Sequence, residues 1–274
     1  MKKIITTLIL TLIFTKAFSC DCEVPKPALE FFSAEYVFEG KAISKIYSSD
    51  SLTYKITFDI LRHYKKGNEP KTLEFTLNSE GEYTGIWTSC DWNVEIGENW
   101  LVYANRRNNK LTFGYFRSNS KQIDKRIISE KEQRALNSGN SFRLENYIYF
   151  VENNFNYTKP ITNVDSILKL GKIKIYEKPH TFLRLLIDDK GQLKKVTTNS
   201  GYEIKTDTLF NLTTEFNISI KKPLTEFQKD AMGLVSKISK WEIKRHKESN
   251  IPVNYIRGFS IAFDNETQKW KYEL

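Results

Sequence analysis

The most restrictive feature of the sequence is the alternation of apolar and polar residues over residues 52–61, LTYKITFDIL. Successive side chains of a β-strand point to opposite sides, so four apolar side chains here would share one face. These four are Tyr54, Ile56, Phe58 and Ile60. Similar short runs, separated by loop-like breaks, lie at residues 33–46, 71–77, 100–104 and 110–116. Five short strands at this spacing predict a small closed barrel.

The chain changes character after the last of these runs. Residues 117–140 are polar and poor in aromatics, and Ile123, Ile127 and Ile128 keep helical spacing. We therefore expect a helical linker over residues 119–140, with a helix that ends near Gly139.

The second half of the chain mixes helical and strand patterns. Leu144, Ile148 and Val151 keep helical spacing, whereas residues 169–175 and 180–187 are strand-like. The turn signal DDKG at 188–191 and the run at 192–198 predict a hairpin. Residues 224–241 predict an amphipathic helix, and 256–263 a last strand. A hairpin, a helix and a strand make a small α+β domain over residues 141–274.

The N-terminus predicts export. Lys2 and Lys3 precede an apolar run of 11 residues at 4–14, which is too short to span a bilayer but suits a signal peptide. Ala17 and Ser19 supply small residues for cleavage before Cys20. We expect residues 1–19 to be removed and the protein to be periplasmic or secreted, with no transmembrane segment afterwards. The alternatives are an uncleaved anchor and an outer-membrane lipoprotein lipidated at Cys20.

Composition favours a folded protein without a nucleic-acid partner. Hydrophobic residues make up 40% of the chain and aromatics 14%, enough for buried cores. The net charge of +9 becomes +6 when Lys2, Lys3 and Lys16 leave with the signal peptide. Acidic and basic residues are interleaved, as in SEKEQR at 129–134. This pattern is typical of a soluble surface rather than of a nucleic-acid site.

Three cysteines in an exported chain allow one disulfide. Cys20 and Cys22 are too close in sequence to pair comfortably with each other, so one of them would pair with Cys90. This disulfide would close a loop of about 70 residues. It would lower the entropy of the unfolded chain and so stabilise the folded state by about 4 kcal/mol. No metal site is expected, since these cysteines and the isolated His63, His180 and His246 lack the spacing of zinc ligands.

Residues 20–117 resemble the netrin-like module of tissue inhibitors of metalloproteinases and their bacterial relatives. The matching pieces are Cys20-Asp21-Cys22, VFEG at 37–40, Cys90, Gly97 and WLVYA at 100–104. The resemblance implies a five-stranded barrel of the oligonucleotide/oligosaccharide-binding (OB) type over residues 20–118.

The resemblance also implies a disulfide between Cys20 and Cys90. The family's partner for Cys22 is missing, because the region after WLVYA reads LTFGYFRS, so Cys22 is expected to be unpaired. A Cys22–Cys90 bond would accompany lipidation of Cys20. In inhibitors of this family the first cysteine's amine and carbonyl chelate a protease's zinc, which makes Cys20, Asp21 and Cys22 the candidate inhibitory edge. Asp21 departs from the small neutral residue usual there.

Residues 142–264 resemble, more loosely, the C-terminal domain of TonB-type energy transducers. The matching pieces are LENYIYFVENNFNY at 144–157, FLRLLIDDKGQLKKV at 182–196, the helix ending at Trp241, and IPVNYIRGFSIAF at 251–263. Such domains add an extended peptide to a sheet edge. The transducers' transmembrane helix and Pro-rich spacer are missing, so the resemblance implies a detached peptide- or protein-binding module.

No catalytic motif occurs in the sequence, so we expect no enzyme and no cofactor. The prediction is a two-domain, exported, non-enzymatic protein of the bacterial cell envelope that binds an unidentified protein or peptide. The alternative is an inhibitor of an exported metalloproteinase acting through Cys20.

Overall fold

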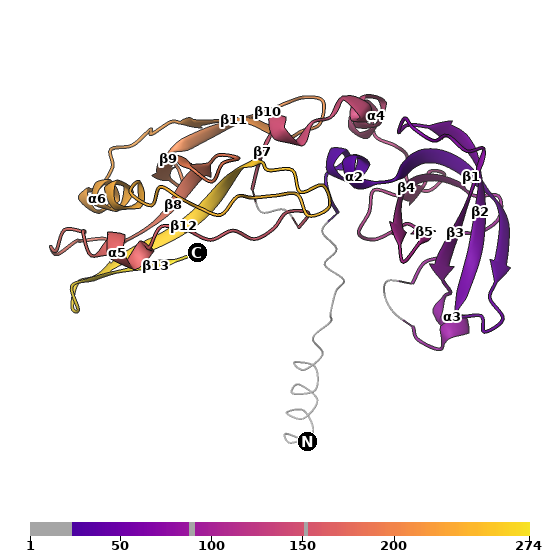
Figure 1. The fold of residues 1–274 in the computed structure, drawn as a ribbon, viewed down its shortest axis with the longest axis horizontal. Helices are drawn as coiled ribbons and strands as arrows, with labels where there is room; N and C mark the ends of the chain where they lie inside the picture. Colours follow the sequence, from indigo (N-terminus) through magenta and orange to yellow (C-terminus); the bar gives the residue numbers. More distant parts are fainter. Residues whose placement is uncertain (1–23, 88–90, 151–152) are drawn as a thin grey trace, which may run out of the picture. The chain divides into compact units, whose positions relative to one another are not determined.

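The computed structural model describes residues 24–87, 91–150 and 153–274. They are mostly β, with few helices (Figure 1). The chain divides into two compact units. Of the described residues, unit 1 contains 24–26 and 34–128, and unit 2 contains 27–33 and 129–274.

Unit 1 is a nearly closed, barrel-like sheet. Its strands are β1 (Tyr36–Tyr47), β2 (Thr53–His63), β3 (Thr72–Asn78), β4 (Asn99–Arg107), β5 (Lys110–Thr112) and the short β6 (Lys121–Gln122). The order is β3-β2-β1-β4-β5, and β6 pairs with β4. The two ends of this path, β3 and β5, come close to each other without forming a ladder. The short helix α3 (Gly81–Thr84) lies between β3 and β4 in the chain.

The alternation in the sequence correctly predicts which face of β2 is buried in the core of unit 1. Tyr54, Ile56 and Phe58 on β2 are fully buried, as one shared face requires. They pack with aromatic side chains from the neighbouring strands, among them Phe38, Phe75, Trp100 and Phe113. All five expected strands are present, although β5 is only three residues long. Asn108 and Asn109 both adopt positive φ, which suits the tight turn of the β4–β5 hairpin.

Unit 2 combines a second sheet with short helices. Its strands are β7 (Ile148–Tyr149), β8 (His180–Ile187), β9 (Leu193–Thr198), β10 (Tyr202–Thr206), β11 (Thr213–Ile218), β12 (Asn254–Asp264) and β13 (Lys269–Glu273). The order is β10-β11-β7-β12-β8-β9, and β13 pairs with β12. The helices are α2 (Pro27–Ser33), α4 (Glu130–Ser138), α5 (Val164–Leu168) and α6 (Glu226–Val235), with the 3₁₀ turns η1 (Gly139–Ser141) and η2 (Leu144–Asn146).

The hairpin and the amphipathic helix of unit 2 are confirmed. Leu185 pairs with Val196 across β8 and β9. Helix α6 begins at a capping box formed by Thr225 and Gln228, and it ends six residues before Trp241. Phe227, Ala231 and Val235 are buried against side chains of β8 and β12.

The expectation that residues 256–263 form the last strand was wrong. These residues belong to β12, which is followed by β13, paired with it from Ser260 to Asp264. Strand β7 pairs with the start of β12 at Asn254 and Tyr255. Both flanking strands come from this chain, so much of the β12 edge opposite β8 is already occupied.

Two further expectations for unit 2 were wrong. Leu144 and Ile148 keep helical spacing, but they lie in a 3₁₀ turn and in β7, because pairing with β11 and β12 outweighs the local pattern. Residues 169–175 form no strand. Strands β10 and β11 were not expected.

The segment expected to be a linker contributes to both units. Residues 121–122 form β6 in unit 1, and the helix begins only at Glu130, where Ser129 caps it. Helix α2 groups with unit 2, although it precedes the barrel strands in sequence. Its Leu29 and Phe31 are buried, and Phe31 lies against Gly139.

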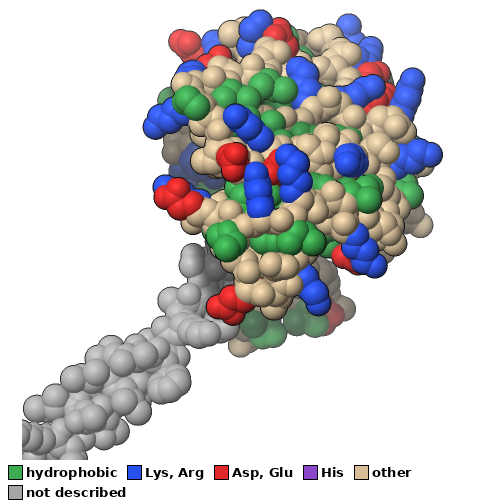
Figure 2. Space-filling model, turned by 90° about the vertical axis from the view of Figure 1, so that its left-hand side faces the viewer, with side chains coloured by type: hydrophobic (Ala, Val, Ile, Leu, Met, Phe, Trp, Pro, Cys, Tyr) green, Lys and Arg blue, Asp and Glu red, His purple; other side chains and the backbone are tan. Residues whose placement is uncertain are grey.

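Charged side chains do not gather into one block on the face shown in Figure 2, where Lys and Arg are spread among uncharged surface. Within residues 24–87, 91–150 and 153–274, no helix combines the length and apolar character needed to cross a membrane.

Candidate functional site

The sequence-predicted site residues Cys20, Asp21, Cys22 and Cys90 lie outside the described residues. The disulfide and the inhibitory edge therefore stay predictions. The structure does describe both flanks of the segment that contains Cys90.

A buried lysine holds these flanks against β1. Lys45 Nζ lies 3.1 Å from Glu80 Oε1 and 3.0 Å from Glu95 Oε1, so it joins the two sides of the segment. Its side chain is only 7% exposed, and its ammonium lies 4.6 Å from the ring centre of Tyr54. Burial alone would lower the pKa of Lys45, but hydrogen bonds to Tyr47, Glu95 and Glu80 raise it. Lys45 therefore stays charged and acts as a clamp.

The segment between these clamped flanks presents an exposed aromatic side chain. Trp87 is 75% exposed and its neighbour Ile86 is 68% exposed. By contrast, Tyr83 packs on Tyr47 with ring centres 4.6 Å apart.

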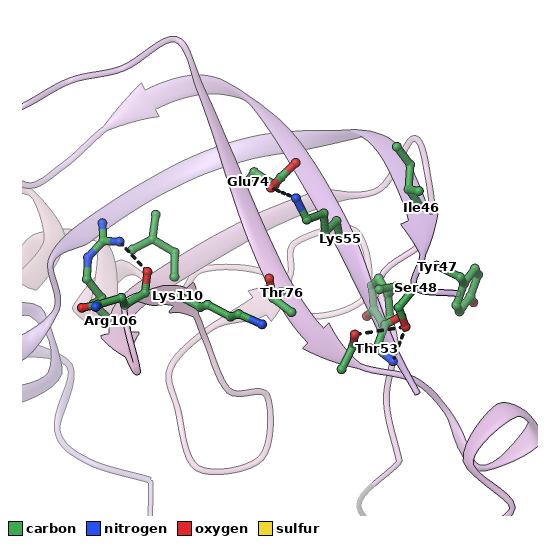
Figure 3. Close-up of a pocket in the computed structure, with 12 residues that line it drawn as sticks. Ile46, Tyr47, Ser48, Thr53, Lys55, Glu74, Thr76, Arg106 and Lys110 are labelled. Carbon is green, nitrogen blue, oxygen red and sulfur yellow. Dashed lines mark hydrogen bonds and ion pairs between the residues drawn. The ribbon is translucent and has the colours of Figure 1, made fainter. Parts of the chain in front are cut away.

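An open groove of about 600 Å³ lies on the barrel wall of unit 1 (Figure 3). Its volume lies in the range of ligand sites. It runs from the β1–β2 connection across β2 and β3 to the β4–β5 hairpin. The residues that line it are Ile46, Tyr47, Ser48, Thr53, Tyr54, Lys55, Glu74, Thr76, Arg106, Asn109, Lys110 and Leu111.

Strand register brings these residues together. Ile46 pairs with Lys55 across β1 and β2, and Lys55 pairs with Thr76 across β2 and β3. Cross-strand neighbours point to the same side of a sheet, so the three side chains form one row. The β4–β5 hairpin contributes Arg106 and Lys110 from the other side of the groove (Figure 3).

Two of the three cations in the groove are neutralised by carboxylates. Lys55 Nζ lies 2.8 Å from Glu74 Oε1. Arg106 donates to both carboxylate oxygens of Glu35, at 3.1 and 2.8 Å. Among the described residues, Lys110 has no carboxylate partner and its ammonium makes no hydrogen bond. Figure 3 shows Lys110 extending across the groove toward Thr76.

Two tyrosines line the groove without offering a free ring. Tyr54 is fully buried, and its hydroxyl accepts a hydrogen bond from the backbone N–H of Val94 at 3.1 Å. Burial raises its pKa. Tyr47 is half-buried and packs on Tyr83. The exposed apolar wall comes instead from Ile46, which is 62% exposed.

A second hollow of about 450 Å³ shares Thr76 with the groove. It continues along β3 to Ser79 and along the opposite segment to Gly114, and it reaches Asp91 and Trp92. The two hollows together follow the seam where β3 and β5 approach without pairing.

The three histidines have different hydrogen-bond partners. His63 Nε2 contacts the carbonyl oxygen of Pro70 at 2.9 Å, and His180 Nε2 lies 3.1 Å from Ser260 Oγ. His246 is buried between Ser33 and Ser249. In the described part of the chain, no three His, Cys, Asp or Glu side chains cluster closely enough to hold a metal ion.

No protein-family model matches the chain, and no curated protein matches it either. The resemblances noted in the sequence therefore stay predictions.

The groove was not expected from the sequence. Its residues are individually ordinary, and only strand register brings them together. The one local signal was the NNK turn at residues 108–110, which places Lys110 at the start of β5.

Proposed function

We propose that this chain is a non-enzymatic binding protein whose groove on the barrel wall holds an extended segment of a partner protein. The observation that carries the proposal is an open groove of about 600 Å³ that combines an exposed isoleucine with an unpaired lysine. Binding surfaces combine exposed apolar side chains with a few polar groups that fix orientation. Ile46 and Lys110 supply these two elements.

The proposal includes the finer fold assignment. We propose that the units are two domains and that unit 1 is an OB-type barrel. The strand order β3-β2-β1-β4-β5, with α3 between β3 and β4, supports this assignment. OB-type barrels bind ligands on strands 2 and 3 between the loops that follow strands 1 and 4, and the groove occupies the equivalent surface.

Unit 2 is a weaker candidate for the same role. Its β8–β9 hairpin, α6 and β12 support a likeness to the C-terminal domain of TonB-type transducers. Peptide addition needs a free strand edge. The edge of β12 opposite β8 is covered by β13 and β7 over much of its length, so we assign the binding role to the barrel groove.

A random dodecapeptide library displayed on phage tests this function. The library is selected on the wild-type protein, and the selected peptides are then measured against Ile46→Ser. This change removes apolar surface without adding charge, and we expect about tenfold weaker binding. Leu61→Ser is the control, since Leu61 is also 62% exposed but lies outside the groove lining. Peptides that bind Ile46→Ser as well as wild type, or a selection that yields no binder, would refute the proposal.

A second candidate function is inhibition of an exported metalloproteinase through the Cys20 amine and carbonyl. The clamp of Lys45 on Glu80 and Glu95 favours it, because the clamp fixes both flanks of the segment that contains the predicted disulfide partner Cys90. One residue added before Cys20 would block the amine. Unchanged inhibition of a metalloproteinase by the extended protein would exclude this mechanism.

A further inference from the structure

The charge balance of the groove points to the kind of segment that it holds. Lys55 and Arg106 are each paired with a glutamate, at 2.8 Å in both cases, so neither needs a ligand to balance its charge. Lys110 remains as the one lining cation without a carboxylate partner in the described structure. The groove therefore carries a local excess of positive charge at Lys110.

Lys110 faces a second free polar group across the groove. The Thr76 hydroxyl lies on β3, is half-buried, and makes no hydrogen bond with the residues that the structure describes. Figure 3 shows Lys110 pointing toward it from β5. An ammonium and a hydroxyl on opposite walls suit a carboxylate placed between them, because both can donate to its oxygens.

The walls beside Lys110 are apolar. Ile46 is 62% exposed, and Leu111 is half-buried next to Lys110 in sequence. Other hydroxyls in the lining are already engaged: Ser48 Oγ lies 2.6 Å from Asp50 Oδ1 and 3.2 Å from Thr53 Oγ1. The groove thus offers one cation without a carboxylate partner, one free hydroxyl and two aliphatic side chains, beside the exposed amide of Asn109.

We propose that the groove selects extended peptide segments with an Asp or Glu next to an aliphatic residue, whose carboxylate contacts Lys110 and Thr76. This inference rests on the proposed function and specifies its ligand.

A polyanion fits the same groove less well. Single-stranded nucleic acids are bound by a positively charged groove together with aromatic rings on which the bases stack. The two tyrosines here are buried or packed against Tyr83. A chain of phosphates or sulfates would also need several free cations, and the groove has one. A single carboxylate beside an aliphatic side chain matches the one cation, the hydroxyl and the aliphatic side chains of the groove.

The test uses the same dodecapeptide selection. We expect the selected peptides to be enriched in Asp or Glu beside Leu, Ile or Val. Lys110→Gln should weaken their binding about tenfold, as loss of a hydrogen bond to a charged group does. A fresh selection on Lys110→Glu should instead favour Lys or Arg. Lys41→Gln is the control, because Lys41 is an exposed lysine of β1 outside the groove lining, and it should leave binding unchanged.

The other outcomes separate this inference from the proposed function. Peptides that depend on Ile46 but show no acidic enrichment and no loss with Lys110→Gln overturn the acidic-peptide inference and leave the proposed function standing. If no peptide depends on Ile46, both fail. Heparin oligosaccharide and oligo-dT are measured as well. If either binds in a way that Lys110→Gln abolishes while no acidic peptide binds, the occupant is a polyanion and the inference is overturned.

Discussion

The two units bury their cores by different means. In unit 1 a single curved sheet wraps around aromatic side chains, with Phe75 packed edge-on against Phe58 and Phe113 at ring-centre distances of 5.7 and 5.3 Å. In unit 2 a sheet is covered by α6 and by backbone segments that pair without forming long strands. Examples are the bridge from Pro160 to Trp241 and the bridge from Gln192 to Lys240.

This difference has a consequence for glycine. In unit 1, backbone carbonyl oxygens lie 3.0 and 2.8 Å from where a Cβ would be added at Gly40 and Gly81. The closest such approach of backbone is at Gly191 in unit 2. At Gly191, in the β8–β9 turn, the backbone lies so close to Trp241 that an added Cβ would collide with its carbonyl oxygen. Gly191 also accepts a hydrogen bond from the Trp241 N–H at 2.8 Å. Gly191 should therefore be more sensitive to an added methyl group than a turn glycine of unit 1 that has open space around it.

The largest expected effect is that of Gly191→Ala. Gly191 has φ +74°, and Gly85 in unit 1 has nearly the same φ, +70°, but open space where a Cβ would lie. The positive φ alone costs about 1–2 kcal/mol for alanine. Collision with Trp241 adds overpacking, so Gly191→Ala should lose about 3–4 kcal/mol of unfolding free energy and Gly85→Ala about 1–2 kcal/mol. Urea denaturation measures both. Equal losses would show that the close approach of Trp241 adds nothing to the cost of the positive φ.

The same contrast explains how much of the fold the sequence predicts. In unit 1, β1 pairs with β2 and β2 with β3, so each alternating run has its partner next in the chain and the local pattern suffices. In unit 2, Ile148 of β7 pairs with Thr213 and Asn254, far along the chain. Its spacing from Leu144 fits a helix, and only distant partners make it a strand. The pattern predicted the β8–β9 hairpin because that contact, again, is local.

The candidate site follows the same rule. The alternating pattern shows that Ile46, Lys55 and Thr76 belong to strands, but it does not give the register that aligns them. Nor does it show that glutamates neutralise Lys55 and Arg106 while Lys110 remains unpaired. Cys20, Cys22 and Cys90 were found from the number and spacing of the cysteines, and the resemblance added Asp21 and the inhibitory edge. Their roles stay predictions. A site assembled from side chains of several strands depends on tertiary structure, whereas a motif consists of residues that are close together in the sequence.

The next largest effect is the loss of stability when a buried lysine of an ion pair is replaced, compared with the same change in an exposed ion pair. Lys45 of unit 1 has a 7% exposed side chain and holds Glu80 and Glu95. Lys205 of unit 2 pairs with Glu215 at 2.9 Å, but its side chain is 68% exposed. Lys45→Met leaves carboxylates without their cation in a partly buried site, so we expect a loss of about 2–3 kcal/mol in urea denaturation. Lys205→Met should leave the denaturation curve unchanged, because exposed pairs contribute little.

Hydrogen exchange shows whether the Lys45 effect is local. Loss of the clamp should speed exchange in residues 79–87 and 91–98 more than in β2. A uniform change, or a loss no larger than that of Lys205→Met, would mean that Lys45 does not clamp the segment.

The smallest effect is a pH dependence that belongs to unit 2. His246 is buried, with Nε2 3.2 Å from Ser33 Oγ of α2 and Nδ1 3.1 Å from Ser249 Oγ. The rings of Phe32 and Phe155 lie 5.5 and 5.4 Å away, and the nearby Glu248 only partly offsets the burial. Burial lowers the pKa of His246 below its ordinary 6.5.

The sign of the effect follows from which state takes up the proton first. As the pH falls through 6.5, the unfolded chain protonates His246 while the folded chain does not, so stability decreases. The decrease stops below the folded pKa, and its slope cannot exceed about 1.4 kcal/mol per pH unit for one proton. Urea denaturation between pH 7.5 and 5.5 measures it above the range in which carboxylates ordinarily titrate. His246→Gln should flatten the slope, while His180→Gln, a change at an exposed histidine, should keep it. If the slope persists in His246→Gln, the pH dependence belongs to another group. The contact between His246 and Ser33 of α2 would then not be its cause.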